Sequence, residues 1–175
     1  EQKRSFKREV FSWIACIVVT ILLTEFILNF VIINANIPSG SMENTIMTND
    51  KLIALRTSYW FNDPKRGDII IFKYPDDETE WFIKRVIALP GETVLVKDGK
   101  VYINGSKKAL SEPYIKEEPV EDFGPYKVPK NGYFVMGDNR NNSNDAREWE
   151  THYVSRDEVL GKAWFRYYPS IKVIK

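Results

Sequence analysis

Cysteine and histidine are almost missing from this 175-residue sequence, which holds one of each, Cys16 and His152. One cysteine excludes a disulfide within the chain, and the two residues together offer too few soft ligands for an ordinary zinc site. An excess of charge is absent as well, because 25 basic residues stand against 24 acidic ones. No nucleic-acid partner is therefore expected. Any chemistry must come from hydroxyls, carboxylates, lysines and the backbone.

One long apolar run stands out from an ordinary globular composition with 43% hydrophobic and 28% charged residues. Residues 10–33 carry only Glu25, Asn29 and a few small hydroxyls among apolar side chains. A helix of this length spans roughly 36 Å, more than the ~30 Å hydrocarbon core of a bilayer. Because the run is apolar on every face, it predicts one transmembrane helix, whereas a helix covering a protein core would show a polar stripe. Whether Glu25 reaches the interface or faces a partner stays open.

The charges beside this run predict its orientation in the membrane. Residues 1–9 contain four basic and two acidic side chains, whereas residues 34–40 contain no basic residue. The positive-inside rule therefore puts residues 1–9 in the cytoplasm as a basic tail and residues 34–175 outside the cell as one domain. A cleavable signal peptide begins in the same way, but its apolar core is shorter and ends at a small-residue cleavage site that is lacking here.

The outer domain reads mostly as strands. Five segments rich in β-branched and aromatic residues are bounded by turn signals: 68–75, 81–89, 93–105, 132–138 and 162–169. Asp98-Gly99 predicts a hairpin turn inside the third segment. Residues 155–162 predict a short helical turn, with Ser155 as its N-cap, Glu158 three residues later and Gly161 as its end. The Pro-rich, acidic residues 110–130 predict an irregular excursion or a small subdomain, and the whole is an anchored, mainly β domain.

A turn with two hydroxyls follows the apolar run. Ser39 and Ser41 flank Gly40 in this turn, which exposes backbone N–H groups and lets a serine side chain project. A nucleophile and an oxyanion site both need such a turn. Ser-Gly-Ser is also common in linkers, and this alternative stays open on the turn alone.

A nucleophilic serine needs a base, for which the sequence offers His152 or a lysine. His152 has charged neighbours and no evident orienting partner, so we expect a surface or packing role for it. On a strand of period two, Lys84 shares a face with Phe82 and Val86, while Arg85 points the opposite way. Burial would lower the pKa of Lys84 and make it a general base. The alternative is a lysine that extends from the strand to solvent.

A polar cluster over residues 136–148 follows another apolar strand. Its Asp, Asn and Arg content is too dense for a core, and it lacks the spacing of an EF-hand calcium loop. Ser143 can hydrogen-bond an amine, while Asp138 and Asp145 can hold Arg85, Arg140 or Arg147. We therefore expect this cluster to support a site formed by other segments.

These segments together resemble type I signal peptidase, the membrane-bound Ser/Lys leader peptidase of bacteria, in its short single-anchor form. The resemblance rests on IPSGSM at 37–42, RGDIIIF at 66–72, FIKRVIALPGE at 82–92 and GDNRNNSNDAR at 137–147, all after an N-terminal anchor. It implies a coiled antiparallel β-sheet peptidase domain of the kind shared with SOS-repressor peptidases.

The resemblance also implies roles for individual residues. Ser41 falls on the nucleophile and Lys84 on the general base, with Ser39 assisting the oxyanion hole and Ser143 positioning the amine. Asp138, Asp145, Arg85 and Arg147 match the supporting polar network. Pockets for small substrate side chains match Ile37, Met42, Ile46, Phe82 and Ile83.

The reaction so implied is acyl transfer without a metal or organic cofactor, cutting signal peptides from secretory preproteins after Ala-x-Ala. The expected partners are these signal peptides, the lipid bilayer and, by proximity, the secretion translocon. Two alternatives differ in class: a self-cleaving Ser/Lys peptidase, and a catalytically silent membrane-anchored binding module.

The sequence departs from the family pattern at several positions. Asn44, within MENTI, stands where proline is usual, and Asn141, Ala146 and Glu148 replace the more common aspartate, serine and aromatic residue. None of them touches Ser41 or Lys84, so they bear on substrate preference and on the supporting geometry more than on activity.

Overall fold

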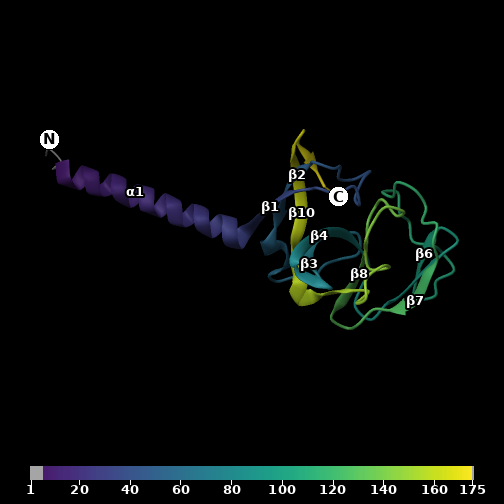
Figure 1. Ribbon diagram of the computed structural model, residues 1–175. Helices are drawn as coiled ribbons and strands as arrows, with labels where there is room; N and C mark the ends of the chain where they lie inside the picture. Colours follow the sequence, from purple (N-terminus) through teal and green to yellow (C-terminus); the bar gives the residue numbers. More distant parts are fainter. Residues whose placement is uncertain (1–5, 175) are drawn as a thin grey trace.

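A computed structural model describes residues 6–174 of the chain. The helix α1 (Phe6–Phe26) is followed by a π-helical turn (Ile27–Val31), and both project away from the β domain (Figure 1). Residues Arg8–Val31 are long and apolar enough to cross a membrane, and none of this span is buried against the rest of the protein. Of the predicted basic tail, residues 1–5 lie outside the described residues.

The helix differs from the predicted span of residues 10–33 at both ends. The helix begins at Phe6, and Ile32 and Ile33 already belong to strand β1 (Ile32–Asn36). Ile33 is 5% exposed and lies in a core cluster of the domain. Apolar side chains suit both lipid and a protein core, so composition alone did not separate the end of the helix from the strand that follows it.

Most of the domain is one antiparallel sheet with the strand order β1-β2-β10-β3-β4-β8-β9, and β11 pairs with β10. Its further strands are β2 (Lys51–Leu55), β3 (Ile69–Tyr74), β4 (Asp77–Ala88), β8 (Gly132–Met136), β9 (Val154–Ser155), β10 (Val159–Tyr168) and β11 (Lys172–Val173). All pairings are antiparallel, as the register of each pair shows. The mainly β fold with one N-terminal helix is therefore confirmed.

A second sheet has three strands in the order β6-β5-β7 and lies on the side of the domain away from α1 (Figure 1). It consists of β5 (Thr93–Lys97), β6 (Lys100–Ile103) and β7 (Phe123–Lys127). The predicted hairpin turn is confirmed, since Asp98 and Gly99 connect β5 to β6 with φ of 49° and 73°. Because β7 pairs with β5, residues 110–130 are not irregular throughout.

The predicted helical turn of residues 155–162 is confirmed only at its start. Ser155 and Glu158 form a capping box around a 3-10 turn (Arg156–Glu158), after which the chain enters β10. Gly161 therefore lies inside a strand, at an irregularity in the pairing of β10 with β3. A side chain there would come within 2.9 Å of the Leu55 carbonyl oxygen, so the glycine permits close strand packing rather than ending a helix.

The core has two parts. The larger cluster lies between the main sheet and the three-stranded sheet and contains Phe72, Phe134 and Trp149 among its buried residues. The smaller cluster contains Ile33, Ile37, Met42, Ile46, Leu52, Ala54, Ile69, Ile71, Ile83 and Ala163. Ile37, Met42 and Ile46 of this cluster belong to the segment that carries the two serines.

Candidate active site

The turn that carries Ser41 is fixed to the protein by its own apolar side chains. Met42 and Ile46 are 0% and 1% exposed, and the Ile46 N–H donates to the Met42 carbonyl oxygen at 2.8 Å. The Glu43 N–H donates to the Gly40 carbonyl oxygen, which closes the turn around Ser41. A linker would have no such anchor, so this segment is a built loop of the domain.

Strand β4 supplies the two adjacent cations, which reach different partners. Lys84 and Arg85 pair in register with Ile70 and Ile69 of β3. The Lys84 amine contacts the hydroxyl of Ser41, whereas the Arg85 guanidinium binds Asp138. The alternation of a strand thus gives the two neighbouring charges separate environments.

The Nζ of Lys84 and the Oγ of Ser41 share a hydrogen bond of 2.6 Å. Lys84 is 4% exposed and Ser41 6%, so neither group extends into solvent. Burial lowers the pKa of Lys84 from 10.5 to about 8; the carboxylates of Asp145 and Asp138 oppose this effect, and the Arg147 cation adds to it. An amine with this pKa is partly neutral near neutral pH and can take a proton from a hydroxyl.

The surroundings of Ser41 include a second hydroxyl and one amide side chain. Ser39 Oγ lies 3.4 Å from Ser41 Oγ. Asn139 holds the turn from the other side, because its N–H donates to the Ser41 carbonyl oxygen at 3.0 Å and its Nδ2 donates to the Gly40 carbonyl oxygen at 2.9 Å. Sequence reasoning did not single out Asn139, although it stands in the polar cluster 136–148.

Ser143 lies next to this turn but does not make the contact predicted for it. A Cβ atom built at Gly137 would fall 2.2 Å from Ser143 Oγ and 2.4 Å from the Ser41 carbonyl oxygen, so all three residues meet closely. Ser143 Oγ is buried and has no hydrogen-bond partner among the described residues. The hydrogen bond from Ser143 to the Lys84 amine is therefore not formed in this structure.

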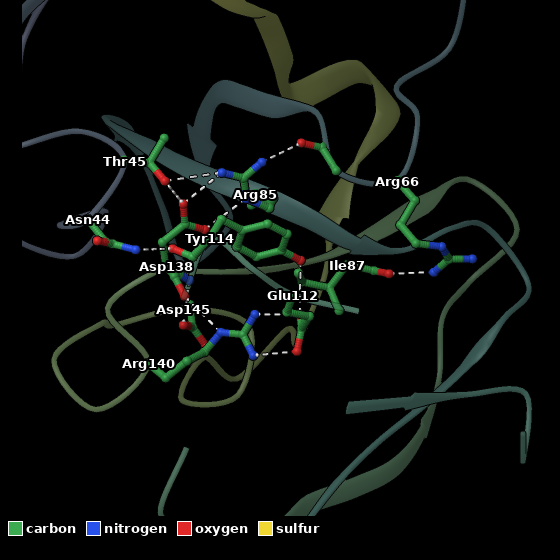
Figure 2. Close-up of polar contacts among 12 residues, drawn as sticks. Asn44, Thr45, Arg66, Arg85, Ile87, Glu112, Tyr114, Asp138, Arg140 and Asp145 are labelled. Carbon is green, nitrogen blue, oxygen red and sulfur yellow. Dashed lines mark hydrogen bonds and ion pairs between the residues drawn. The ribbon is translucent and has the colours of Figure 1, made fainter. Parts of the chain in front are cut away.

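Three buried ion pairs lie near the site, and Figure 2 shows two of them, Arg85 with Asp138 and Arg140 with Glu112. Arg85 binds Asp138 through two hydrogen bonds of 2.8 and 2.7 Å, with the two side chains 2% and 0% exposed. Arg147 binds Asp145 at 2.9 Å, and this carboxylate also accepts the Gly137 N–H. The third pair, Arg140 with Glu112, was not predicted. Both carboxylates singled out in the polar cluster, Asp138 and Asp145, are therefore paired with arginines.

An apolar cavity of about 700 Å³ opens beside Ser41 and Lys84. It is bordered by residues 33–41 on one side and 80–84 on the other, with Ile71, Asn142 and Asn144 completing the lining. Of the predicted pocket residues, Ile37, Phe82 and Ile83 line this cavity. Met42 and Ile46 do not, since both are buried in the core beneath it. Their apolar side chains fit either position, so the sequence did not separate the two.

His152 lies away from the hydroxyl and amine. Its ring packs edge-on against Phe123 and Tyr126, with centroids 5.2 and 5.5 Å apart, and its Nδ1 lies 2.7 Å from the Ala146 carbonyl oxygen. The packing role expected for it agrees with these contacts. Within residues 6–174, no three His, Cys, Asp or Glu side chains converge in the way a metal ion requires.

A hydroxyl and a buried amine beside an apolar cavity are the parts of an activated nucleophile, as hydrolases of peptides and esters use them. The family described as signal peptidase, peptidase S26, matches residues 10–168. The chain therefore belongs to the signal peptidase family, and it is a peptidase that removes signal peptides.

Individual relatives agree with this assignment. The chain is 44% identical to a probable signal peptidase I-2 of Synechocystis, over 89% of this chain and 72% of the relative. It is 46% identical to a signal peptidase I of Leptolyngbya laminosa, over 86% and 75% of the two chains. With a signal peptidase I of Bacillus amyloliquefaciens the identity is 34% over all of this chain and 97% of the relative.

A solved structure is also similar. It is the crystal structure of a signal peptidase I from Enterococcus faecalis, with a TM-score of 0.50 and 36% identity. The match covers 97% of that chain and 58% of this one.

Proposed function

We propose that this signal peptidase cuts preproteins with Ser41 as nucleophile and Lys84 as general base, through an acyl-enzyme. The observation that carries the proposal is the 2.6 Å contact between a hydroxyl and an amine that is 4% exposed. Burial brings the pKa of this amine to about 8, so a useful fraction of it is neutral. A lysine reaching into solvent would keep its ordinary pKa and be a poor base.

The first half of the reaction forms the acyl-enzyme. The lone pair of neutral Lys84 accepts the proton of the Ser41 hydroxyl, and the resulting alkoxide attacks the carbonyl carbon of the scissile peptide. The oxyanion that develops accepts hydrogen bonds from the Ser39 hydroxyl and the Ser41 N–H. When the C–N bond breaks, the Lys84 ammonium gives its proton to the leaving amine.

The second half releases the signal peptide. Neutral Lys84 takes a proton from a water molecule, and the hydroxide formed attacks the ester carbon. The ester bond then breaks and the proton returns to Ser41. Each turnover thus consumes one water molecule and leaves both side chains as they began, with no step assigned to a metal or organic cofactor.

The apolar cavity supports a substrate with small side chains before the cut. Strand β1 is an edge strand of the main sheet. Strand β8 pairs with β4 only at Arg85–Ala88 in the described chain, so residues 81–84 of β4 have no partner strand on that side. The cavity between residues 33–37 and 81–84 is therefore bordered by two backbone edges, between which an extended peptide can bind as an added strand. Ile37, Phe82 and Ile83 give this cavity an apolar lining, which suits the small apolar side chains of an Ala-x-Ala site.

The helix α1 supports a membrane anchor that crosses once, with the domain outside the cell, in the orientation that the basic flank favours. A signal peptide occupies the same bilayer. Tethering the cavity beside the membrane raises the effective concentration of the scissile bond, and it also places the enzyme near the secretion translocon.

The test is cleavage of a preprotein-like peptide with an Ala-x-Ala site by the full chain in detergent. Ser41→Ala and Lys84→Ala are each expected to abolish cleavage while leaving the thermal unfolding midpoint high enough for assay. Ser111→Ala and Lys107→Ala, at exposed positions, are the matched controls and retain full activity. Wild-type rates in either dyad variant contradict the proposal.

The same experiment separates the two alternatives. A binding module would retain the peptide without cutting it, in the wild type as in the variants. A self-cleaving peptidase would yield fragments of its own chain by mass spectrometry and leave the added peptide intact.

A further inference from the structure

Residues 112–116 form a short segment, here called the strap, and Figure 2 shows two of its side chains, Glu112 and Tyr114, beside Arg85 and Arg140. The strap follows β6 and precedes β7, in the part of the chain expected to be irregular. The Ile115 N–H donates to the Glu112 carbonyl oxygen, so the strap turns back on itself. No sequence motif singled it out, yet it contacts three of the segments that form the site.

The first contact joins the strap to strand β4. The guanidinium carbon of Arg85 lies 3.9 Å from the centre of the Tyr114 ring. Figure 2 shows the ring between Arg85 and Glu112. A cation stacked at this distance on an aromatic face is attracted to it, most strongly where water is excluded. Since Arg85 is 2% exposed, the ring covers a buried charge.

The second contact joins the strap to the loop after β8. The two oxygens of Glu112 bind Arg140 at 3.0 and 2.6 Å, with the side chains 6% and 0% exposed. The Tyr114 hydroxyl donates to the same carboxylate at 3.0 Å. In addition, the Lys116 N–H donates to the Asp138 carbonyl oxygen at 3.0 Å. The ring is thereby held in its place over Arg85.

The third contact joins the strap to the turn of the nucleophile. Asn44 Nδ2 donates to the carbonyl oxygens of Tyr114 and Ile115 at 2.9 and 3.2 Å. The Lys116 amine forms an ion pair with Glu43 at 3.0 Å. Both Glu43 and Asn44 follow Ser41 closely in the chain, so the strap is bound to the turn itself.

These contacts lie on a continuous path between the two reacting groups. Arg85 is the neighbour of Lys84 on β4 and binds Asp138, whose carboxylate also accepts the Thr45 hydroxyl. Asn139, the next residue, holds the Ser41 carbonyl oxygen. The strap braces this path at both ends, through Tyr114 on Arg85 and through Asn44 on the turn.

We propose that the strap sets the alignment of the Ser41 hydroxyl with the Lys84 amine, and that Tyr114 is its positioning residue, acting through Arg85 and Asp138. The proposal rests on the dyad assigned above. Proton transfer and attack depend steeply on geometry, and a displacement of about 1 Å can cost on the order of 100-fold in rate. The apolar cavity is formed by other residues, so substrate binding does not depend on the strap.

The experiment measures kcat and KM of the full chain with the Ala-x-Ala peptide. Tyr114→Leu removes the ring from Arg85 and is expected to lower kcat about 10- to 100-fold, with KM changed less than about twofold. Tyr114→Phe keeps the ring and loses only the hydroxyl, and it retains kcat within about threefold of the wild type. The pH profile of kcat/KM is also measured for Tyr114→Leu. A midpoint equal to that of the wild type is expected, because the Lys84 amine keeps its buried environment in this variant.

Two further variants complete the test. Tyr133→Leu removes a tyrosine that is 2% exposed in the large core cluster; it lowers the unfolding midpoint and leaves kcat unchanged. Asn44→Gly tolerates the φ of 93° at this position and removes the two hydrogen bonds from the turn to the strap, while the Lys116–Glu43 ion pair remains. It is therefore expected to lower kcat severalfold with unchanged KM even where Tyr114→Leu fails to fold.

The outcomes distinguish the strap from the dyad. Wild-type kcat in Tyr114→Leu and Asn44→Gly overturns the proposal, as does an equal loss in Tyr114→Phe or in Tyr133→Leu. Cleavage by Ser41→Ala would instead discredit the dyad on which the strap acts.

Discussion

Lys84 Nζ and Ser41 Oγ lie 2.6 Å apart, although the two residues are 43 positions apart in the sequence. A loop and a strand, each held in place by different contacts, bring the two side chains together. The serine is carried by a loop anchored through buried Met42 and Ile46, and the lysine by the strand β4, which is paired on both sides at Arg85. Asp138 and Asn139 then connect the loop to the strand through Arg85, Thr45 and the Ser41 carbonyl oxygen. The chemistry of the pair therefore depends on a network outside it.

Cleavage is expected to rise with pH through a midpoint near 8, because the pKa of buried Lys84 lies at about 8. Below the midpoint the amine is protonated and cannot accept the Ser41 proton, so kcat/KM falls about tenfold per pH unit. Initial rates with the Ala-x-Ala peptide at low substrate concentration measure this directly. A rate independent of pH, or a midpoint at the ordinary lysine value of 10.5, would contradict the assignment of the base.

Lys84→Met is expected to stabilise the protein at neutral pH while abolishing cleavage. The pKa of Lys84 is about 8 in the folded chain and 10.5 unfolded, so between these values the unfolded state binds more protons and wild-type stability rises with pH. Below about pH 8 both states are protonated and the folded state bears the full cost of the buried charge, about 3 kcal/mol. The methionine variant lacks this cost.

Urea unfolding at two pH values measures the difference. The free energy of unfolding of Lys84→Met should exceed that of the wild type by up to about 3 kcal/mol at pH 7, and the excess should vanish above about pH 10.5. Lys73→Met, whose side chain is 40% exposed, is the control and should show no such pH-dependent excess. An excess that does not change with pH would mean that the gain comes from packing instead.

The sequence predicted those parts of the site that follow from local patterns. The alternation of side chains along the strand predicted over residues 81–89 put Lys84 and Arg85 on opposite faces. The density of charged residues in 136–148 indicated that Asp138 and Asp145 bind arginines. These inferences need only the geometry of a strand and the cost of burying unpaired charge. The same holds for the hairpin turn at Asp98, which depends on two adjacent residues.

What the sequence did not predict are features that depend on distant contacts. Glu112 binds Arg140, 28 positions further along the chain, and nothing local distinguishes Glu112 from the other acidic residues between 112 and 122. Ile33 and Met42 are apolar residues whose exposure depends on which element covers them. Strand β1 continues the apolar run of the helix without a break in composition, so the boundary was set by pairing with β2.

Asn141→Asp restores the residue that is more usual at this position and is expected to destabilise this protein slightly. Asn141 Oδ1 accepts the Val120 N–H at 2.9 Å, and its Nδ2 donates to the Glu118 carbonyl oxygen at 3.0 Å. An aspartate keeps the first contact but turns the second into a repulsion between oxygens, at a cost of about 1 kcal/mol. Thermal unfolding checks this, with exposed Asn131→Asp as the control. An unchanged midpoint in Asn141→Asp would show that this contact contributes nothing.

Gly137→Ala is expected to abolish most activity without touching the reacting groups. A methyl group there would come within 2.2 Å of Ser143 Oγ and 2.4 Å of the Ser41 carbonyl oxygen. The second of these atoms is backbone, fixed by Asn139, and cannot rotate away as a flexible side chain would. The turn must therefore shift, and a displacement of about 1 Å at the nucleophile lowers kcat on the order of 100-fold.

The matched control is Gly105→Ala, where nothing lies within 4 Å of the added methyl group but φ is 68°. There the cost is backbone strain of about 1 kcal/mol, which lowers the unfolding midpoint and leaves kcat at the wild-type level. Overpacking at Gly137 also costs about 1–3 kcal/mol of stability. Both variants are therefore less stable than the wild type, but only Gly137→Ala has a lowered kcat. Were Gly137→Ala to cleave as fast as Gly105→Ala, the position of the Ser41 backbone would not limit the reaction, and its tie to Asn139 would have no role in catalysis.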